Sequence, residues 1–171
     1  MESRVQVRAA TPQDAFAIAA IYAPHVLYGS ASFEVEAPDA EEILRRRASI
    51  LELGLPYLIA EIDGETAGYA YASRFRPRAA YRFTAENSVY VAERFQRRGV
   101  ARLLMQRLME LCANAGIREM IAVIADPSIS LPSVTLHRSL GFQEVGVLRG
   151  VGEKFGRALD VLMMQRTLTS G

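Results

Sequence analysis

Hydrophobic positions along the chain change between two periods, and the changes predict a mixed α/β domain. Apolar or alternating runs predict strands at residues 4–8, 57–62, 66–72, 87–92, 120–124, 142–148 and 160–164. Apolar residues at helical spacing predict helices that start at Thr11 and span 38–53, 99–115 and 133–140. The resulting order, β-α-α-β-β-β-α-β-α-β-β, fits neither a doubly wound fold nor a barrel, because strands and helices do not alternate regularly.

Length and composition indicate a single domain over residues 1–171. No Pro/Gly/Ser-rich linker, internal repeat or low-complexity tract divides the chain. Cys112 is the only cysteine, which excludes an intrachain disulfide and a zinc site built on paired cysteines, and we predict no metal site. The chain shows no signal-peptide pattern and no apolar run near the roughly 20 residues that span a bilayer. We therefore expect a cytoplasmic protein without a membrane partner.

Charge is balanced over the whole chain but segregated along it. The 20 basic and 19 acidic residues give a net charge of +1, which argues against a strongly basic nucleic-acid binder. Residues 74–107 contain nine Arg and two acids, whereas residues 34–65 contain nine acids and three Arg. The Arg-rich segment can hold an anion, or the two blocks can simply offset each other. No aromatic stacking platform interleaves with the arginines, so we predict no nucleic-acid partner.

The segment Gln96-Arg-Arg-Gly-Val-Ala101 joins a predicted strand to a long predicted helix. The first N–H groups of a helix have no internal partner and carry partial positive charge, so this end binds phosphate readily. Gly99 allows close backbone approach, and Arg97 and Arg98 can add charge-assisted bonds. Neither a P-loop nor a dinucleotide fingerprint is present, which argues against nucleotide hydrolysis and hydride transfer. The alternative is an ordinary helix start with solvated arginines.

The same six residues are similar to the Q/R-x-x-G-x-G/A signature of the GCN5-related N-acetyltransferases. Further marks, in the order of that family, point to its phosphinothricin and methionine sulfoximine acetyltransferase branch: 31–34 (ASFE), 68–73 (GYAYAS), 75–81 (FRPRAAY), 86–91 (ENSVYV), 121–124 (IAVI), 136–137 (LH), 140–142 (LGF), 149–152 (RGVG), 154–157 (KFGR) and 159–160 (LD). The resemblance implies a central mixed, mostly antiparallel sheet flanked by helices, acetyl-CoA as co-substrate, a small-molecule amine as acceptor, and a homodimer.

The resemblance also assigns the donor side. The loop is expected to cradle the pyrophosphate of acetyl-CoA, backbone from Val89 to Val91 to pair with the pantetheine arm, and the Val91 N–H to stabilise the oxyanion. The cofactor-binding set is Val89, Tyr90, Val91, Gln96, Arg97, Arg98, Gly99, Val100, Ala101, Arg102, Ser130 and Ser133. Two positions depart from the family, since Ser130 stands near a usual Asn and Ala158 where the branch often has Trp.

Two residues are candidates for proton transfer. Strand alternation places Glu86, Ser88 and Tyr90 on one face. By resemblance, Glu86 takes the proton from the amine, directly or through water, and the neighbouring arginines should keep it ionised. The alternative is a surface charge at a strand start. His137 stands where the family places the acid for the leaving thiolate, and the alternative is a helix residue hydrogen-bonded for packing.

The acceptor side is assigned from loops. By resemblance, Arg76, Arg78 and Tyr81 grip acidic groups of the acceptor, for which a bidentate guanidinium is suited. The alternative for the two arginines is a solvated loop or an interchain ion pair. Phe33 and Glu34 form another edge, and Glu86 and Ser88 complete the substrate-binding set. The Arg45–Arg47 run is predicted to be an exposed helix face without function. The expected activity is acetyl transfer to the α-amino group of a small amino acid or analogue. The alternatives are a protein N-terminus, another amine, or a non-catalytic acetyl-CoA-binding module.

Overall fold

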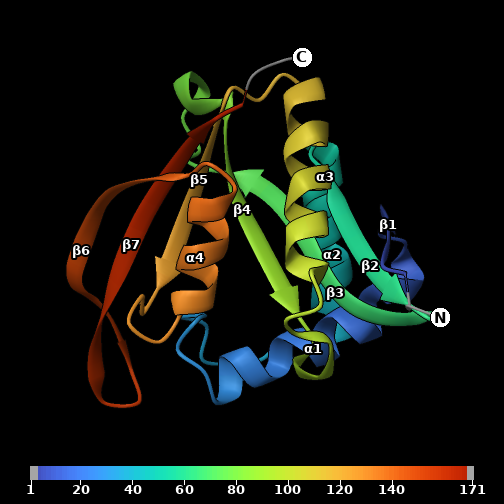
Figure 1. The fold of residues 1–171 in the computed structure, drawn as a ribbon, viewed down its shortest axis with the longest axis horizontal. Coiled ribbons are helices and arrows are strands. Elements are labelled where there is room, and N and C mark those ends of the chain that lie inside the picture. The colour runs from blue at the N-terminus through green and yellow to red at the C-terminus, as the bar shows by residue number, and fades with distance from the viewer. Residues whose placement is uncertain (1–3, 169–171) are drawn as a thin grey trace.

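A computed structural model describes residues 4–168, which fold into a seven-stranded sheet with helices on both faces (Figure 1). The strands are β1 (Gln6–Ala9), β2 (Tyr57–Ile62), β3 (Glu65–Arg74), β4 (Thr84–Val91), β5 (Glu119–Ala125), β6 (Gln143–Lys154) and β7 (Arg157–Thr167). The α-helices are α1 (Ala15–Leu27), α2 (Ala40–Glu52), α3 (Val100–Asn114) and α4 (Leu131–Ser139). Single 3-10 turns lie at Pro12–Asp14, Ala79–Tyr81 and Glu93–Phe95. The predicted order of strands and α-helices is confirmed.

The sheet has the order β1-β2-β3-β4-β5-β7-β6, and β4 with β5 is the parallel pair in this described range. α3 supplies the crossover that a parallel pair needs. β4 and β5 pair only over Thr84–Glu86 and Glu119–Ile121, and beyond these residues the two arrows separate (Figure 1). The mixed, mostly antiparallel sheet is thus confirmed, and it contains a gap between its two central strands.

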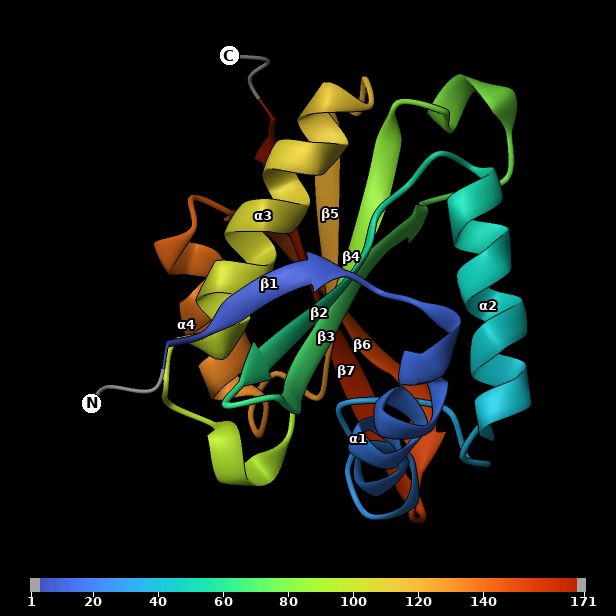
Figure 2. The same cartoon turned by 90° about the vertical axis from the view of Figure 1, so that its right-hand side faces the viewer.

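Two α-helices cover each face of the sheet in the described range. Figure 2 shows α3 and α4 on one side and α1 and α2 on the other. Alternation along β4 sends Ala85 and Asn87, both buried, toward α3 and α4. The opposite face carries Glu86, Ser88 and Tyr90, as predicted. On that face the Tyr90 ring packs against Tyr22 of α1, with the ring centroids 5.0 Å apart.

The hairpin of β6 and β7 is longer than predicted. The expected strands, 142–148 and 160–164, extend to a two-residue turn at Phe155-Gly156, where both φ angles are positive (51° and 70°). β6 is exposed at residues 143–151, so its side chains do not alternate between core and solvent. The alternation of apolar and polar residues that indicates a strand is therefore missing from this segment. Gly150 and Gly152 also interrupt the β-forming run, and the register shifts between Leu148 and Gly152.

In the part of the chain that the structure describes, no helix is both long enough and apolar enough to cross a membrane. The cytoplasmic location and the lack of a nucleic-acid partner stay predictions.

Candidate active site

The free edge of β4 faces the gap. The Ala92 N–H donates to Ala67 O (2.9 Å) and the Phe75 N–H to Thr84 O (3.5 Å). Antiparallel alternation then directs the even-numbered residues of β4 to β3 and the odd-numbered ones toward β5. Because pairing with β5 ends at Glu86, the backbone of Val89 and Val91 faces the gap. The register therefore corrects one part of the prediction, since the Tyr90 backbone is committed to β3.

The start of α3 presents unpaired N–H groups next to this gap. Gly99 has φ = +79° and Arg97 has φ = +58°, so the loop turns twice through the left-handed region. The Leu103 N–H makes the first helical bond, to Gly99 O (3.2 Å), which leaves the N–H groups of Val100, Ala101 and Arg102 without a partner inside the helix. A Cβ on Gly99 would meet no atom within 4 Å. The space above the helix start is open to an anion, and the residues fit the phosphates of acetyl-CoA.

The arginines of the loop differ in their contacts. Arg97 and Arg98 are exposed together with Gln96, and neither arginine forms an ion pair with another residue of the range 4–168. The Arg98 guanidinium lies 5.5 Å from the centre of the Phe95 ring. Arg102 instead donates to Ser139 Oγ (2.7 Å) and joins α3 to α4. Arg97 and Arg98 therefore have their charge available for a bound anion.

Asn87 and His137 meet where β4 and β5 separate. Asn87 Nδ2 donates to Ile121 O (3.2 Å), and Asn87 Oδ1 lies 2.9 Å from His137 Nε2. His137 Nδ1 lies 2.8 Å from Ser133 O, and the side chain is 2% exposed. Burial lowers the pKa of His137, against a smaller opposing effect of the Ser133 carbonyl. Both ring nitrogens are thus engaged within the protein, which favours the packing alternative.

Ser130 and Ser133 lie at the start of α4, near His137. Ser130 Oγ donates to Ala125 O (2.8 Å), and Ser133 Oγ lies 3.4 Å from His137 Nδ1. Both hydroxyls are therefore used locally, although each oxygen keeps capacity to accept a further hydrogen bond. Ser130 thus lies at the end of β5 and Ser133 beside His137, and their cofactor-binding role stays a prediction.

Glu86 is half-buried and lies opposite Ser73 of β3. Burial raises the pKa of Glu86. Within residues 4–168, no arginine forms an ion pair with this carboxylate. The Arg-rich segment was expected to keep Glu86 ionised, but burial, and not a neighbouring arginine, is what shifts its pKa. A raised pKa suits a carboxylate that must accept a proton.

A second carboxylate, Glu34, is held on the same face of the sheet. Arg46 donates to both of its oxygens, to Oε1 at 2.6 Å and to Oε2 at 3.0 Å, and the Tyr22 hydroxyl also donates to Oε2. The hydrogen bonds from Arg46 lower the pKa of Glu34, with help from Tyr22 and against the effect of burial. Arg46 is thus half-buried against Glu34, which corrects its prediction as an exposed residue of the helix face.

The other arginines of the same run show why sequence spacing could not reveal Arg46. Arg45 is exposed and pairs with Glu41 and Glu42. Arg47 donates to Ala10 O at 2.8 Å. Three successive helix residues point in three directions, and only the fold decides which of them meets Glu34.

The remaining predicted acceptor residues lie on exposed segments. Arg76, Arg78 and Tyr81 belong to the loop between β3 and β4, where Arg76 and Tyr81 pack on Phe75. No ion pair of Arg76 or Arg78 occurs within the described residues. Phe33 lies against Gly152 of β6, where any Cβ would overlap its ring.

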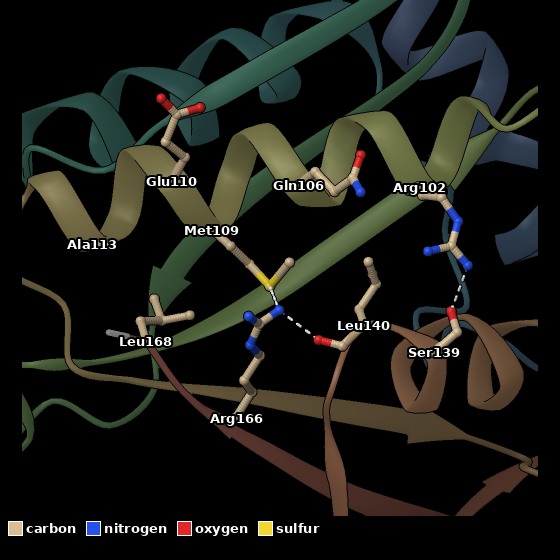
Figure 3. Close-up of a pocket in the computed structure, with 9 residues that line it drawn as sticks. All are labelled: Arg102, Gln106, Met109, Glu110, Ala113, Ser139, Leu140, Arg166 and Leu168. Atoms are coloured by element: carbon tan, nitrogen blue, oxygen red, sulfur yellow. Dashed lines mark hydrogen bonds between the residues drawn. The ribbon is translucent and has the colours of Figure 1, made fainter. Parts of the chain in front are cut away.

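A cavity of about 470 Å³ lies between α3, the end of α4 and β7 (Figure 3). It shares only Arg102 with the predicted set. Its lining is Arg102, Gln106, Met109, Glu110, Ala113, Ser139, Leu140, Arg166 and Leu168. Figure 3 shows Arg166 bridging toward Met109 and Leu140 across this cavity. The Arg102–Ser139 contact is at one end of it, so this cavity is distinct from the gap between β4 and β5.

Comparisons with known proteins agree with this geometry. Residues 7–163 match the acetyltransferase (GNAT) domain family. The chain is 48% identical over 165 residues to a phosphinothricin N-acetyltransferase of Alcaligenes faecalis, and the matched region covers 96% of this chain and 83% of that protein. It is 35% identical over 162 residues to an L-methionine sulfoximine/L-methionine sulfone acetyltransferase of Salmonella typhimurium, covering 95% and 94% of the two chains.

Solved structures show the same fold. The phosphinothricin acetyltransferase of Sinorhizobium meliloti, in complex with acetyl-CoA, has a TM-score of 0.92 and 40% identity, over 96% of this chain and 88% of that one. The ribosomal-protein-alanine N-acetyltransferase of Brucella melitensis has a TM-score of 0.91 and 37% identity, over 95% and 99%. The chain therefore belongs to the acetyltransferase (GNAT) domain family, and it is an N-acetyltransferase that uses acetyl-CoA as co-substrate.

Proposed function

We propose that the enzyme acetylates the α-amino group of a small amino acid or analogue of the phosphinothricin, methionine sulfoximine or methionine sulfone type, by direct transfer with Glu86 as proton acceptor. The observation that carries this proposal is the placement of Glu86 and the free β4 edge on one strand. Glu86 stands where pairing with β5 stops, and Val89 and Val91 follow within the gap. A proton acceptor and a backbone donor are thus fixed on one rigid element.

Bound acetyl-CoA supplies an acetyl thioester with a thiol leaving group. The N–H groups at the start of α3, with Arg97 and Arg98, hold its phosphates. The Val89 backbone aligns the pantetheine arm as a neighbouring strand would be aligned. The Val91 N–H faces the gap, where it is available to stabilise negative charge on the acetyl oxygen.

Glu86 removes the proton that the attacking amine must lose. Its raised pKa brings its basicity closer to that of an α-amino group, whose unperturbed pKa is roughly 8. The leaving thiolate needs a proton donor, and His137 is the candidate. Asn87 and Ser133 already engage both of its ring nitrogens, however, so neither nitrogen faces the thiolate freely. His137 acts as the acid only if the contact with Asn87 opens.

The acceptor is placed between two kinds of group. Phe33 and the Glu34–Arg46 pair line one side, and the fixed carboxylate can attract the ammonium form of the amine before it loses its proton. Arg76 and Arg78 supply exposed positive charge for a carboxylate or phosphinate group. A small zwitterionic acceptor fits this combination.

A second acceptor class is favoured by the likeness to the ribosomal-protein-alanine N-acetyltransferase. A protein N-terminus also presents an α-amino group, but without a free carboxylate for Arg76 and Arg78. The two classes therefore differ in the charge that they bring to this loop.

The test is a panel assay of thiol release from acetyl-CoA. We expect release with phosphinothricin, methionine sulfoximine or methionine sulfone, and little with alanine-terminated peptides. Release with the peptides alone would establish the second class, and no release with any acceptor would contradict the proposed function.

We also propose that the enzyme is a homodimer. Exposed apolar side chains gather on β6, among them Val145, Val147 and Val151. Large exposed apolar patches mark association surfaces. Light scattering should give twice the chain mass of 18.9 kDa, and Val147→Asp should shift the species toward the monomer.

A further inference from the structure

Lys154 is the only lysine of the chain, and it is 5% exposed at the end of β6. Its Nζ donates to Ser32 O (2.7 Å) and Gly29 O (2.8 Å), and at longer range to His25 O (3.4 Å). All three carbonyls belong to the end of α1 and the segment that follows it. Figure 2 shows the end of the red hairpin beside the blue α1. A residue near the C-terminal end of the fold thus binds a segment more than 120 positions earlier.

The three contacts match the chemistry of an ammonium group. An ammonium has three N–H donors and no acceptor, and here each donor meets a carbonyl. Within residues 4–168, no carboxylate forms an ion pair with Lys154. Burial lowers the pKa of Lys154, and the charge of nearby Glu34 opposes this effect. Burying a cation without an ion-pair partner is costly, so three oriented carbonyls are the compensation that the fold provides.

The segment that Lys154 holds leads directly to the acceptor side. Ser32 precedes Phe33 and Glu34, and the Ser32 hydroxyl lies 2.6 Å from Tyr22 OH. Two further contacts attach the same segment to the C-terminal half of the fold. Ser30 Oγ donates to Asp126 Oδ2 (2.5 Å), and the Phe33 ring lies against Gly152.

We infer that Lys154 is a positioning residue for the acceptor, because its ammonium fixes the 29–32 backbone and thereby the places of Phe33 and Glu34. This inference rests on the proposed function, which assigns those two residues to the acceptor pocket. Lys154 does not touch the donor side, so its removal should affect acceptor binding and leave acetyl-CoA binding intact.

The experiment compares Lys154→Met and Lys154→Gln with Arg149→Gln, a control that removes a positive charge from an exposed position of the same hairpin. We expect the acceptor KM to rise about tenfold or more in Lys154→Met and less in Lys154→Gln, which keeps two donors, with little change in kcat. The Kd for acetyl-CoA should stay within about twofold of the wild-type value in all three. An unchanged acceptor KM in Lys154→Met, or an equal loss of acetyl-CoA affinity, would overturn the inference.

Two further measurements keep the test decisive. Hydrogen exchange of the 29–34 amides should be at least about tenfold faster in Lys154→Gln than in Arg149→Gln, a readout that does not need activity. If Lys154→Met does not fold, Gly152→Ala provides a second way to displace Phe33. Its new methyl group overlaps the Phe33 ring, so the acceptor KM should rise while Lys154 stays in place. Faster exchange in an enzyme that acetylates none of the panel would contradict the proposed function alone. Unchanged exchange would remove the role of Lys154.

Discussion

In the proposed site, the donor side is made mostly of backbone, whereas the acceptor side is made of side chains from distant segments. On the donor side, the β4 edge and the α3 start lie within one stretch, residues 84–103. On the acceptor side, Glu34 depends on Arg46 from α2 and on Tyr22 from α1, and the segment before it depends on Lys154. The donor side therefore depends on φ angles and strand register, and the acceptor side on tertiary packing.

Because of this difference, we predict that substitutions on the two sides change different kinetic constants. Changes at the loop should alter acetyl-CoA affinity, and changes in the Glu34 network should alter acceptor KM. Changes at Glu86, the proposed proton acceptor, should alter kcat. Each prediction below tests that separation.

The largest effect is expected for Gly99→Asp. The new carboxylate would stand in the open space proposed for the phosphates, and repulsion of roughly 4 kcal/mol at 4 Å corresponds to about a thousandfold loss of affinity. Gly116→Asp is the matched control, because Gly116 also has a positive φ (+89°, against +79° at Gly99) and equally open surroundings at the other end of α3. Calorimetry should show acetyl-CoA binding to the control and not to Gly99→Asp. Equal affinities would remove the phosphate-binding role of this loop.

Glu86→Gln should lower kcat by about 10²-fold, within the usual range for loss of a general base. Its Kd for acetyl-CoA should not change. Because burial raises the pKa of Glu86, kcat/KM of the wild type should fall with decreasing pH at a value above the roughly 4.3 of an ordinary Glu. In Glu86→Gln that acidic limb should move up toward the pKa of the amine itself, whereas it should stay in place in Glu93→Gln, which alters the other acid of the Arg-rich segment. A variant that keeps both turnover and the limb would exclude Glu86 as the base.

Arg46→Gln should raise the acceptor KM about tenfold, because it removes two charge-assisted hydrogen bonds that fix Glu34. Both side chains are about one-third exposed, so water screens part of the loss. Arg45→Gln, on the adjacent exposed position of α2, should leave the KM for both substrates unchanged. Steady-state kinetics with each substrate varied in turn distinguishes these outcomes. A parallel rise in the KM for acetyl-CoA would argue against two separable sides.

The smallest catalytic effect is expected for His137→Gln. The buried Asn87–His137 contact should be weakened, which lowers the free energy of unfolding by about 1–3 kcal/mol. Thermal unfolding should detect this as a lower Tm, while kcat falls less than about tenfold if the role is packing. Arg138→Gln, next to it and exposed, serves as the control. A loss of kcat beyond about 10²-fold at unchanged stability would instead establish the acid role.

How well each side could be predicted from the sequence follows from the same difference between local backbone and distant side chains. The order of elements and the α3 start could be predicted because periodicity, turn glycines and a contiguous motif are local properties. The Glu34–Arg46 pair could not, since its members are 12 positions apart and are separated by a loop and half a helix. The β6–β7 turn could not be predicted, because an exposed strand has no buried face and therefore no regular alternation of apolar and polar residues. The burial of Glu86, and hence its raised pKa, depends on tertiary packing that the local sequence does not encode.

The burial of Lys154 also limits the reaction of this side chain with the enzyme's own acetyl-CoA. Acetyl thioesters react with free lysine amines, and this chain offers one such side chain, buried and with its three donors directed at carbonyls. An amine in that position has no lone pair exposed for attack while it stays protonated. Amine-directed reagents such as succinimidyl esters should therefore leave this side chain unlabelled in the folded enzyme and modify it after denaturation.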